Sequence, residues 1–186
     1  MRDSNRTKKM IADVMRELMQ EKSFEKISIS DICDRCDMNR KSFYYHFLDK
    51  YDLVNWIFDT EFIPVIQRVM NEKSGIVLET MAELLYQNRK FYSKALQIQG
   101  QNSFSEHFHE MVYSVVSTRL EELADVKHAK EFQKQFLTDA VVMAFKRWIS
   151  EGNDLSPQEF VEEIMMEYLE NSLTYQEYIS LRNSVG

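Results

Sequence analysis

The chain has 186 residues, of which 44% are hydrophobic, so it can bury a core as one compact domain or as a small and a medium domain. Only four Gly and two Pro occur, which disfavours a fold rich in strands and turns and favours long helices. The net charge is −7, no apolar run is long enough to span a membrane, and two Cys without a signal peptide predict a cytoplasmic protein with reduced thiols.

The charge divides unevenly along the chain. Up to position 50 there are 11 Lys+Arg and 9 Asp+Glu, or +2, and the remainder has 23 − 11 = 12 basic and 30 − 9 = 21 acidic residues, or −9. This asymmetry fits a DNA-facing head on an acidic body that phosphate repels. A charge of +2 is also ordinary, so charge alone does not establish DNA binding.

The first helix is expected after a short basic start. Residues 1–9 contain Arg2, Arg6, Lys8 and Lys9 and read as a frayed tail or as an arm that seeks phosphate, of which we favour the tail. The apolar stripe of the helix, which ends near residues 21–23, consists of Ile11, Val14, Met15, Leu18 and Met19.

Residues 27–50 predict two short helices joined by a tight turn. Ser28 suits an N-cap, and Asp31 three residues later completes a capping-box pattern. The inner face of this helix is formed by Ile29, Ile32, Cys33 and Cys36. Asp37 tolerates a left-handed conformation and so predicts the turn, while Met38 packs inward.

The second short helix presents its polar side because it is too short to have a core of its own. Asn39 is its expected cap, and Phe43 and Phe47, four residues apart, are its expected buried anchors. No acid occurs between Met38 and Leu48, and the polar side carries Arg40, Lys41, Ser42, Tyr44, Tyr45 and His46. Such groups bind phosphate oxygens and base edges, so the pattern predicts a helix-turn-helix whose second helix enters the major groove.

The same residues resemble the DNA-binding domain of the TetR family of transcription regulators. The resemblance covers the first third of the chain, with FYYHF at 43–47 and a lysine three residues on as its most specific part. The chain departs from the family pattern at Asp37, where a glycine is usual, and at Leu48, where a proline is frequent.

This resemblance implies an all-α homodimer with a three-helix DNA-binding head at 1–50, a connecting helix at 51–74 and a larger dimerisation and effector-sensing bundle at 75–186. Double-stranded DNA and an unknown small-molecule effector or partner protein are the implied partners. By position, Ser28 and Lys50 contact phosphates, Asn39, Arg40, Lys41 and Tyr45 face the groove, and Tyr44 and His46 pack against or bond to backbone phosphates.

The connecting helix is expected to start at Asp49, an N-cap, with Asp52 in its first turn. Pro64 removes a backbone donor, so a kink or break is expected close to Ile63 before the pattern resumes to about residue 73. A break would let the connecting helix act as a lever that changes the spacing of two DNA-binding heads, although a packing irregularity explains Pro64 equally well.

Helices are expected in the body at 76–88, 89–98, from Ser103 with its capping partner Glu106, at 129–150, and from Ser156-Pro157 onward. The tail beyond about residue 174 is expected to be frayed. The last two helices are apolar over a wide arc. The resemblance implies that they pair with a second copy in a four-helix bundle, and burial in the monomer core is the alternative.

Three groups of residues have both a functional and a structural interpretation. Cys33 and Cys36 form CxxC but lie on one inner face without a second pair, so buried core residues are favoured over a redox or zinc site. His107 and His109 point to opposite sides of a helix, which disfavours a metal with Glu106 and Glu110. A mixed set of aromatic and polar residues either lines an effector pocket or simply forms core: Tyr86, Phe91, Tyr92, Gln97, Gln99, Asn102, Phe104, His107, Tyr113, Phe145 and Trp148.

No Gly-rich phosphate loop, GxSxG elbow or HExxH occurs, so we expect no enzyme, no catalytic residues, no metal and no cofactor. We expect a ligand- or partner-responsive regulator, in the commoner case a repressor, that binds a palindromic operator as a homodimer. The segment GQNSF at 100–104 is similar to the dihydroxyacetone-kinase operon activator group, which adds activation as a second mode. The alternative is an all-helical protein-interaction or small-molecule-binding module without DNA binding.

Overall fold

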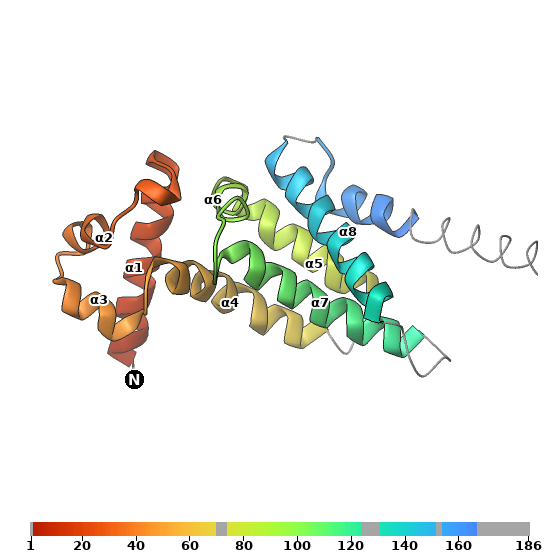
Figure 1. Ribbon diagram of the computed structural model, residues 1–186, viewed down its shortest axis with the longest axis horizontal. Coiled ribbons are helices and arrows are strands. Elements are labelled where there is room, and N and C mark those ends of the chain that lie inside the picture. The colour runs from red at the N-terminus through yellow and green to blue at the C-terminus, as the bar shows by residue number, and fades with distance from the viewer. Residues whose placement is uncertain (1, 70–73, 124–130, 152–153, 167–186) are drawn as a thin grey trace, which may run out of the picture.

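The computed structural model describes residues 2–69, 74–123, 131–151 and 154–166. All regular elements in these ranges are helices, which confirms the predicted fold class for this part of the chain. In chain order they are α1 (Arg2–Glu21), the 3-10 helix η1 (Phe24–Lys26), α2 (Ile29–Arg35), α3 (Arg40–His46), α4 (Lys50–Val69), α5 (Ser74–Gln87), α6 (Arg89–Ala95), α7 (Phe104–Leu123), α8 (Glu131–Ser150) and a helix over 157–166. Figure 1 shows α1 to α3 as a head at one end, α5 to α8 as a body at the other, and α4 between them.

The head closes around two aromatic anchors on α3. Phe43 is fully buried and Phe47 is 2% exposed, as their spacing predicts. Their rings lie 5.9 Å apart, and the Trp56 ring of α4 packs edge-on to Phe47 at 5.6 Å. The inner face of α3 is therefore occupied by the head core, and its other faces remain available to solvent.

The basic start of the chain is helical, so the predicted frayed tail is wrong. Helix α1 begins at Arg2. The Lys8 ammonium lies 4.9 Å from the Phe47 ring and 5.4 Å from the Trp56 ring, a distance at which the cation is attracted to the ring face. This contact, made by a residue of the second turn, holds the beginning of α1 against the head core.

Short polar caps define the two helices of the turn motif. The Ser28 hydroxyl accepts from the Asp31 amide at 3.1 Å, and the Asp31 carboxylate accepts from the Ser28 amide at 2.7 Å. Asn39 caps α3 through its side-chain oxygen, which accepts from the Ser42 amide at 2.9 Å. Asp37 has a φ of 49°, the left-handed conformation predicted for the turn.

Helix α4 passes through Pro64 without ending, so of the two expected outcomes the break is wrong, and the kink stays a prediction. Phe62 is 1% exposed and Ile66 is 8% exposed, so apolar side chains on both sides of Pro64 are buried against neighbouring helices. This burial offsets the loss of one backbone hydrogen bond. The N-terminus of α4 matches the prediction, since the Asp49 carboxylate accepts from the Tyr51 and Asp52 amides at 2.8 Å.

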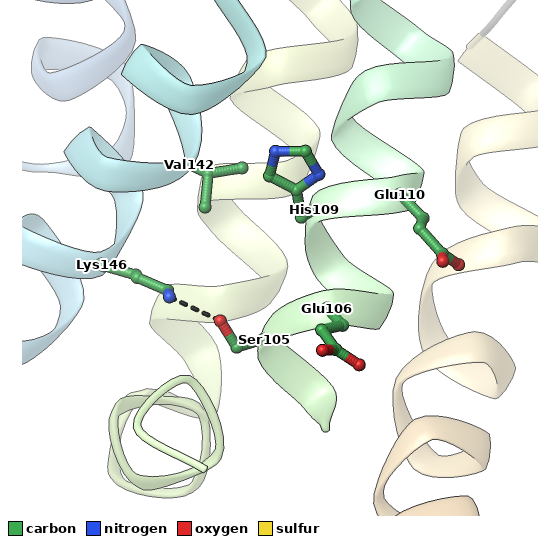
Figure 2. Close-up of a pocket in the computed structure, with 6 residues that line it drawn as sticks. All are labelled: Ser105, Glu106, His109, Glu110, Val142 and Lys146. Carbon is green, nitrogen blue, oxygen red and sulfur yellow. Dashed lines mark hydrogen bonds between the residues drawn. The ribbon is translucent and has the colours of Figure 1, made fainter. Parts of the chain in front are cut away.

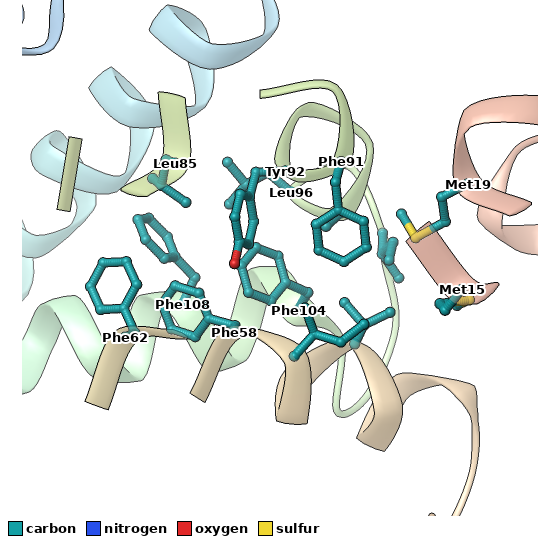
Figure 3. Close-up of a cluster of buried hydrophobic side chains, with 14 of the residues drawn as sticks. Met15, Met19, Phe58, Phe62, Leu85, Phe91, Tyr92, Leu96, Phe104 and Phe108 are labelled. Atoms are coloured by element: carbon teal, nitrogen blue, oxygen red, sulfur yellow. The ribbon is translucent and has the colours of Figure 1, made fainter. Parts of the chain in front are cut away.

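The body is built around stacked and edge-on aromatic rings (Figure 3). The ring of Phe58 on α4 has its centroid between 4.3 and 6.1 Å from four others, those of Phe62, Tyr92, Phe104 and Phe108. A second group joins α8 to the last described helix, because the Trp148 and Phe160 rings stack at 4.3 Å. The predicted end of the connecting helix near residue 73 and the tail beyond residue 174 lie outside the described residues.

The left-handed conformation of Asp37 gives a stability prediction. Asp37→Val is expected to lower the free energy of unfolding by about 1–2 kcal/mol, because a β-branched side chain crowds the backbone at positive φ. Asp37→Gly, which meets no such crowding, is expected to retain the wild-type value. Urea titration of both variants measures the difference, and equal losses in the two would contradict a strained turn.

Candidate nucleic-acid interface

The solvent side of α3 carries a cationic and aromatic surface. Lys41 is exposed, Tyr44 is 53% exposed and Tyr45 is 81% exposed, and these positions share one side of the helix at spacings of three and four. A tyrosine that leaves its ring in water loses the stabilisation that burial would supply. The arrangement therefore presents rings and an ammonium group for contact with another molecule.

The beginning of α3 adds a second cation and an amide. Arg40 is exposed in the first turn, next to the cap residue Asn39. The cap uses the Asn39 carboxamide oxygen, which also accepts from the Ser42 hydroxyl at 3.2 Å, so the carboxamide nitrogen is the group left to donate. Guanidinium and amide groups of this kind pair with guanine and adenine edges.

A shallow, open hollow of about 320 Å³ lies beside these groups and is lined by Asn39, Lys41, Ser42, Tyr45 and His46. His46 is half-buried, its ring stands edge-on to Tyr45 at 5.1 Å, and its Nδ1 is buried without a hydrogen-bond partner in the described structure. Four of the predicted site residues thus meet at one place on the head. Tyr44 stands beside them, edge-on to the buried Phe43 at 5.6 Å.

Ser28 is exposed but already has hydrogen-bond partners. Its hydroxyl donates to the Asp31 carboxylate at 2.7 Å, and Lys22 lies 3.0 Å from the same oxygen. The bonds from Ser28, with help from Lys22, hold the pKa of Asp31 well below its usual range, so the carboxylate beside Ser28 is charged. A phosphate contact by Ser28 stays a prediction.

Lys50 lies apart from the α3 surface. Its ammonium donates to the carbonyl oxygens of Phe24 at 2.8 Å, Ile27 at 2.9 Å and Glu25 at 3.4 Å, and it lies 4.3 Å from the Phe24 ring. Partial burial lowers the pKa of Lys50. These bonds tie the start of α4 to the segment before α2, so Lys50 positions the turn motif, and its predicted phosphate contact stays a prediction.

The interpretation of the sequence did not identify Leu48 as an exposed apolar residue just after α3. Leu48 is 77% exposed, and its backbone amide donates to the Asp52 carboxylate at 2.8 Å. Leu48 follows Phe47, which ends α3 in an extended conformation, so the spacing of a helical face does not give its position. Leu48 adds an apolar side chain at the C-terminal end of α3.

The predicted pocket aromatics are mainly core residues. Phe91, Tyr92, Phe104, Phe145 and Trp148 are each no more than 4% exposed, and their rings pack on one another and on neighbouring rings. These five residues therefore belong to the core of the body.

A different hollow, of about 310 Å³, lies on the surface between α7 and α8 (Figure 2) and is lined by Ser105, Glu106, His109, Glu110, Val142 and Lys146. The Lys146 ammonium crosses it to the Ser105 hydroxyl at 2.5 Å. Five of the six lining residues have polar side chains, and the hollow is open to solvent, unlike the enclosed sites that bury small molecules.

The metal and redox interpretations find no support in the described residues. The His107 Nε2 lies 2.6 Å from Asp59 on α4, a bond that raises the pKa of His107, whereas the His109 Nε2 lies 2.8 Å from Asp139 on α8. No three potential metal ligands gather in the part of the chain that the structure describes. Cys33 and Cys36 are free and buried, and burial raises the pKa of Cys36 to about 11, as expected for core thiols.

One face of α8 is apolar and exposed. Phe132 is 79% exposed, Phe136 is 61% exposed and Met143 is 53% exposed, and the two phenylalanine rings stack at 6.2 Å. Phe145 and Trp148, predicted for the same stripe, are instead buried in the body. The wide apolar arc thus divides into one face inside the monomer and one face toward solvent.

Among the described helices, none combines the length and the hydropathy that crossing a membrane would need.

Comparisons with known proteins place both parts of the chain among transcription regulators. A model of the C-terminal region of transcriptional regulators matches residues 72–169, and a model of bacterial regulatory proteins of the tetR family matches residues 11–57. The HTH-type dhaKLM operon transcriptional activator DhaS of Lactococcus lactis subsp. lactis (strain IL1403) is 29% identical over 167 residues, which are 83% of this chain and 86% of that protein.

Solved structures share the fold. The dihydroxyacetone kinase operon activator DhaS aligns with a TM-score of 0.62 and 24% identity over 89% of this chain and 95% of that chain. A TetR transcriptional regulator from Streptococcus agalactiae 2603V aligns with a TM-score of 0.72 and 21% identity over the same shares of the two chains.

The bonds of Lys50 predict a loss of stability that an exposed lysine does not share. Lys50→Met is expected to lower the free energy of unfolding by about 1–3 kcal/mol, because three carbonyl oxygens lose a charged donor. The matched control Lys41→Met is expected to change it by less than about 0.5 kcal/mol. Urea titration measures both, and a loss at Lys50 no larger than at Lys41 would contradict the positioning role.

Proposed function

This chain belongs to the TetR family of transcription regulators, and we propose that it binds a palindromic operator as a homodimer through the exposed surface of α3. In this proposal, an effector or partner protein that binds the helical body regulates operator binding by the head. The proposed division is a head at 1–50, a connecting helix at 51–74 and a body at 75–186, and a cytoplasmic location is part of the same proposal.

One observation supports the proposed interface most directly. Phe43 and Phe47 are buried, so Lys41 and Tyr45 extend from the opposite side of α3, and Arg40 is exposed in its first turn. In this proposal Asn39, Arg40, Lys41 and Tyr45 contact base edges in the major groove, and Tyr44 and His46 contact backbone phosphates. Lys50 acts indirectly, by holding the turn motif in place.

The exposed face of α8 supports the proposed homodimer. Phe132, Phe136 and Met143 form an unpartnered apolar face in the single chain. A short recognition helix reads only a few base pairs, so two half-sites and a two-fold dimer are needed for useful discrimination. We propose that this face of α8 pairs with the same face of a second copy.

The sign of regulation is part of the proposal. Repression is the common mode in the family, whereas the Lactococcus relative is by its name an operon activator. The GQNSF segment and the similarity to DhaS favour activation, with a small-molecule effector or a partner protein that binds one state of the body better than another. Transcription of the bound promoter, measured with and without the protein, tests the sign.

Two features of the sequence favour the alternative of a helical module without DNA binding: the turn lacks a glycine, and the net charge is acidic. The first loses its weight because Asp37 adopts the left-handed conformation of the turn. The acidic charge lies mainly beyond position 50. A salt-dependent shift of a labelled random duplex separates the two functions, since a module of this kind should show none.

Arg40 is predicted to contribute sequence-specific contacts. Arg40→Ala is expected to weaken binding to the cognate operator by about 1–3 kcal/mol and to change binding to a scrambled duplex less, since the lost contact is to a base. Lys90→Ala removes the same positive charge from the exposed side of α6, away from both proposed interfaces, and is the matched control. Gel-shift titration at fixed salt measures both, and equal operator affinity for Arg40→Ala and wild type would reject the role.

Phe136 is predicted to lie in the dimer interface. Phe136→Glu is expected to weaken dimerisation by at least about 2 kcal/mol, because two-fold symmetry places the new charge twice in an apolar contact. Ile63→Glu, at a 49% exposed apolar residue of α4, serves as the control and should stay dimeric. Sedimentation equilibrium distinguishes the species, and an unchanged dimer of Phe136→Glu would contradict this interface.

A further inference from the structure

We propose that Glu61 is the anchor that fixes the orientation of the head relative to the body, with Arg16 and Tyr92 as its partners. These positioning residues set which half-site spacing the dimer accepts. The spacing part of the inference rests on the proposed operator binding, whereas the anchor itself does not.

The two oxygens of the Glu61 carboxylate serve different parts of the molecule. Arg16 on α1 of the head donates to Oε1 at 2.7 Å. The Tyr92 hydroxyl on α6 of the body donates to Oε2. Glu61 itself lies on α4, the helix between the two parts, so one carboxylate joins three elements.

The environment strengthens these bonds. Tyr92 is fully buried, and the side chains of Arg16 and Glu61 are 21% and 27% exposed. Burial and the neighbouring Glu61 raise the pKa of Tyr92, so its hydroxyl remains a donor. Hydrogen bonds to charged groups that are partly shielded from water are stronger than neutral bonds at the surface.

Two further contacts hold α1 against α6 at the same junction. The Arg16 guanidinium lies 5.0 Å from the Phe91 ring. The Lys94 ammonium donates to the carbonyl oxygens of Met19 at 2.5 Å and Gln20 at 3.3 Å, at the C-terminal end of α1, where a cation is favoured.

The apolar part of the junction alone does not define an angle. Figure 3 shows Met15 and Met19 of α1 on the side of the cluster where Phe91 lies. Apolar burial is non-directional, and methionine adapts to shifted neighbours. Hydrogen bonds depend on distance and angle, so the bonds of Glu61 and Lys94 select one orientation among those that the apolar contacts allow. Of the two residues, Glu61 is the one that joins α4 to both the head and the body.

The orientation of each head decides where α3 lies relative to α3 of the second copy. Operator half-sites are separated by about one helical turn, ~34 Å, so a rotation of the heads changes the spacing that both can read together. A firm anchor therefore gives a narrow spacing preference, and a loosened anchor gives a broad one.

A series of duplexes tests the spacing. The operator is synthesised with the distance between half-sites unchanged, one base pair longer or one base pair shorter, and affinities are measured for wild type, Tyr92→Phe and Glu61→Gln. In each variant the ratio between the preferred and the altered spacings is expected to fall by about tenfold, within the usual range of coupling between sites. Wild-type ratios in both variants, with folded protein by circular dichroism, would overturn the inference.

Tyr113→Phe is the matched control. The Tyr113 hydroxyl donates to the two oxygens of the Glu131 carboxylate at 2.9 and 3.0 Å, which joins α7 to α8 within the body alone. The change removes the same group from the same kind of bond without touching the head. It is expected to keep the wild-type spacing ratio, and a fall equal to that of Tyr92→Phe would overturn the special role of Glu61.

A distance measurement tests the anchor without DNA or dimerisation. Asp34 on α2 and Glu83 on α5 are exposed and can be changed to Cys and spin-labelled, while the native thiols are buried and have raised pKa values. The doubly labelled chain is mixed with an excess of unlabelled chain, so that distances within one chain dominate.

The head–body distance distribution is expected to be narrow in wild type and Tyr113→Phe and broader in Tyr92→Phe and Glu61→Gln. Equal widths in all four proteins would overturn the anchor. If wild type binds no duplex, the proposed function fails. The widths of the head–body distance distributions still decide whether Glu61 fixes the orientation of the head.

Discussion

The burial of Phe43 and Phe47 is the constraint on which the arrangement of the head depends. A helix of seven residues has little stability of its own, so α3 exists because these two rings fill the head core and pack against Trp56 and Tyr44. Once they point inward, helical geometry directs Lys41 and Tyr45 outward. The polar caps at Ser28 and Asn39 then fix where each helix of the turn begins.

Charge and shape agree in dividing the molecule. The cationic and aromatic surface lies on the head, whereas the acidic excess lies beyond position 50 and so does not oppose approach of a phosphate backbone to α3. Lys50 illustrates that a lysine near such a surface need not contact a ligand. The Lys50 ammonium donates to three backbone carbonyl oxygens, and these bonds support the turn motif.

Helix α4 belongs to both halves of the molecule. Its first turn is tied to the head by Lys50, its middle supplies Phe58 and Phe62 to the aromatic core of the body, and Glu61 lies between those two rings in sequence. Continuity through Pro64 means that α4 can transmit a displacement as one element. Polar bonds to α1, α6 and α7 leave α4 from Asp59 and Glu61, so residues within three successive positions of this helix contact one helix of the head and two helices of the body.

The sequence by itself determined the helical class, the turn motif and the outward face of α3, because caps, helical spacing and the FYYHF run are local signals that operate within a few residues. It also predicted the cap at Asp49 and the buried state of Cys33 and Cys36. The same local signals allowed a break at Pro64 and favoured a frayed start of α1, and the structure has neither, because burial of Phe62 and Ile66 and the contact of Lys8 with two rings come from residues distant in the chain. Only the tertiary structure decided the role of Lys50, the division of the α8 stripe into inner and outer faces, and the meeting of Arg16, Glu61 and Tyr92. Those features depend on which helices lie side by side, and helical periodicity gives the face of a residue without naming the neighbour that the face will meet.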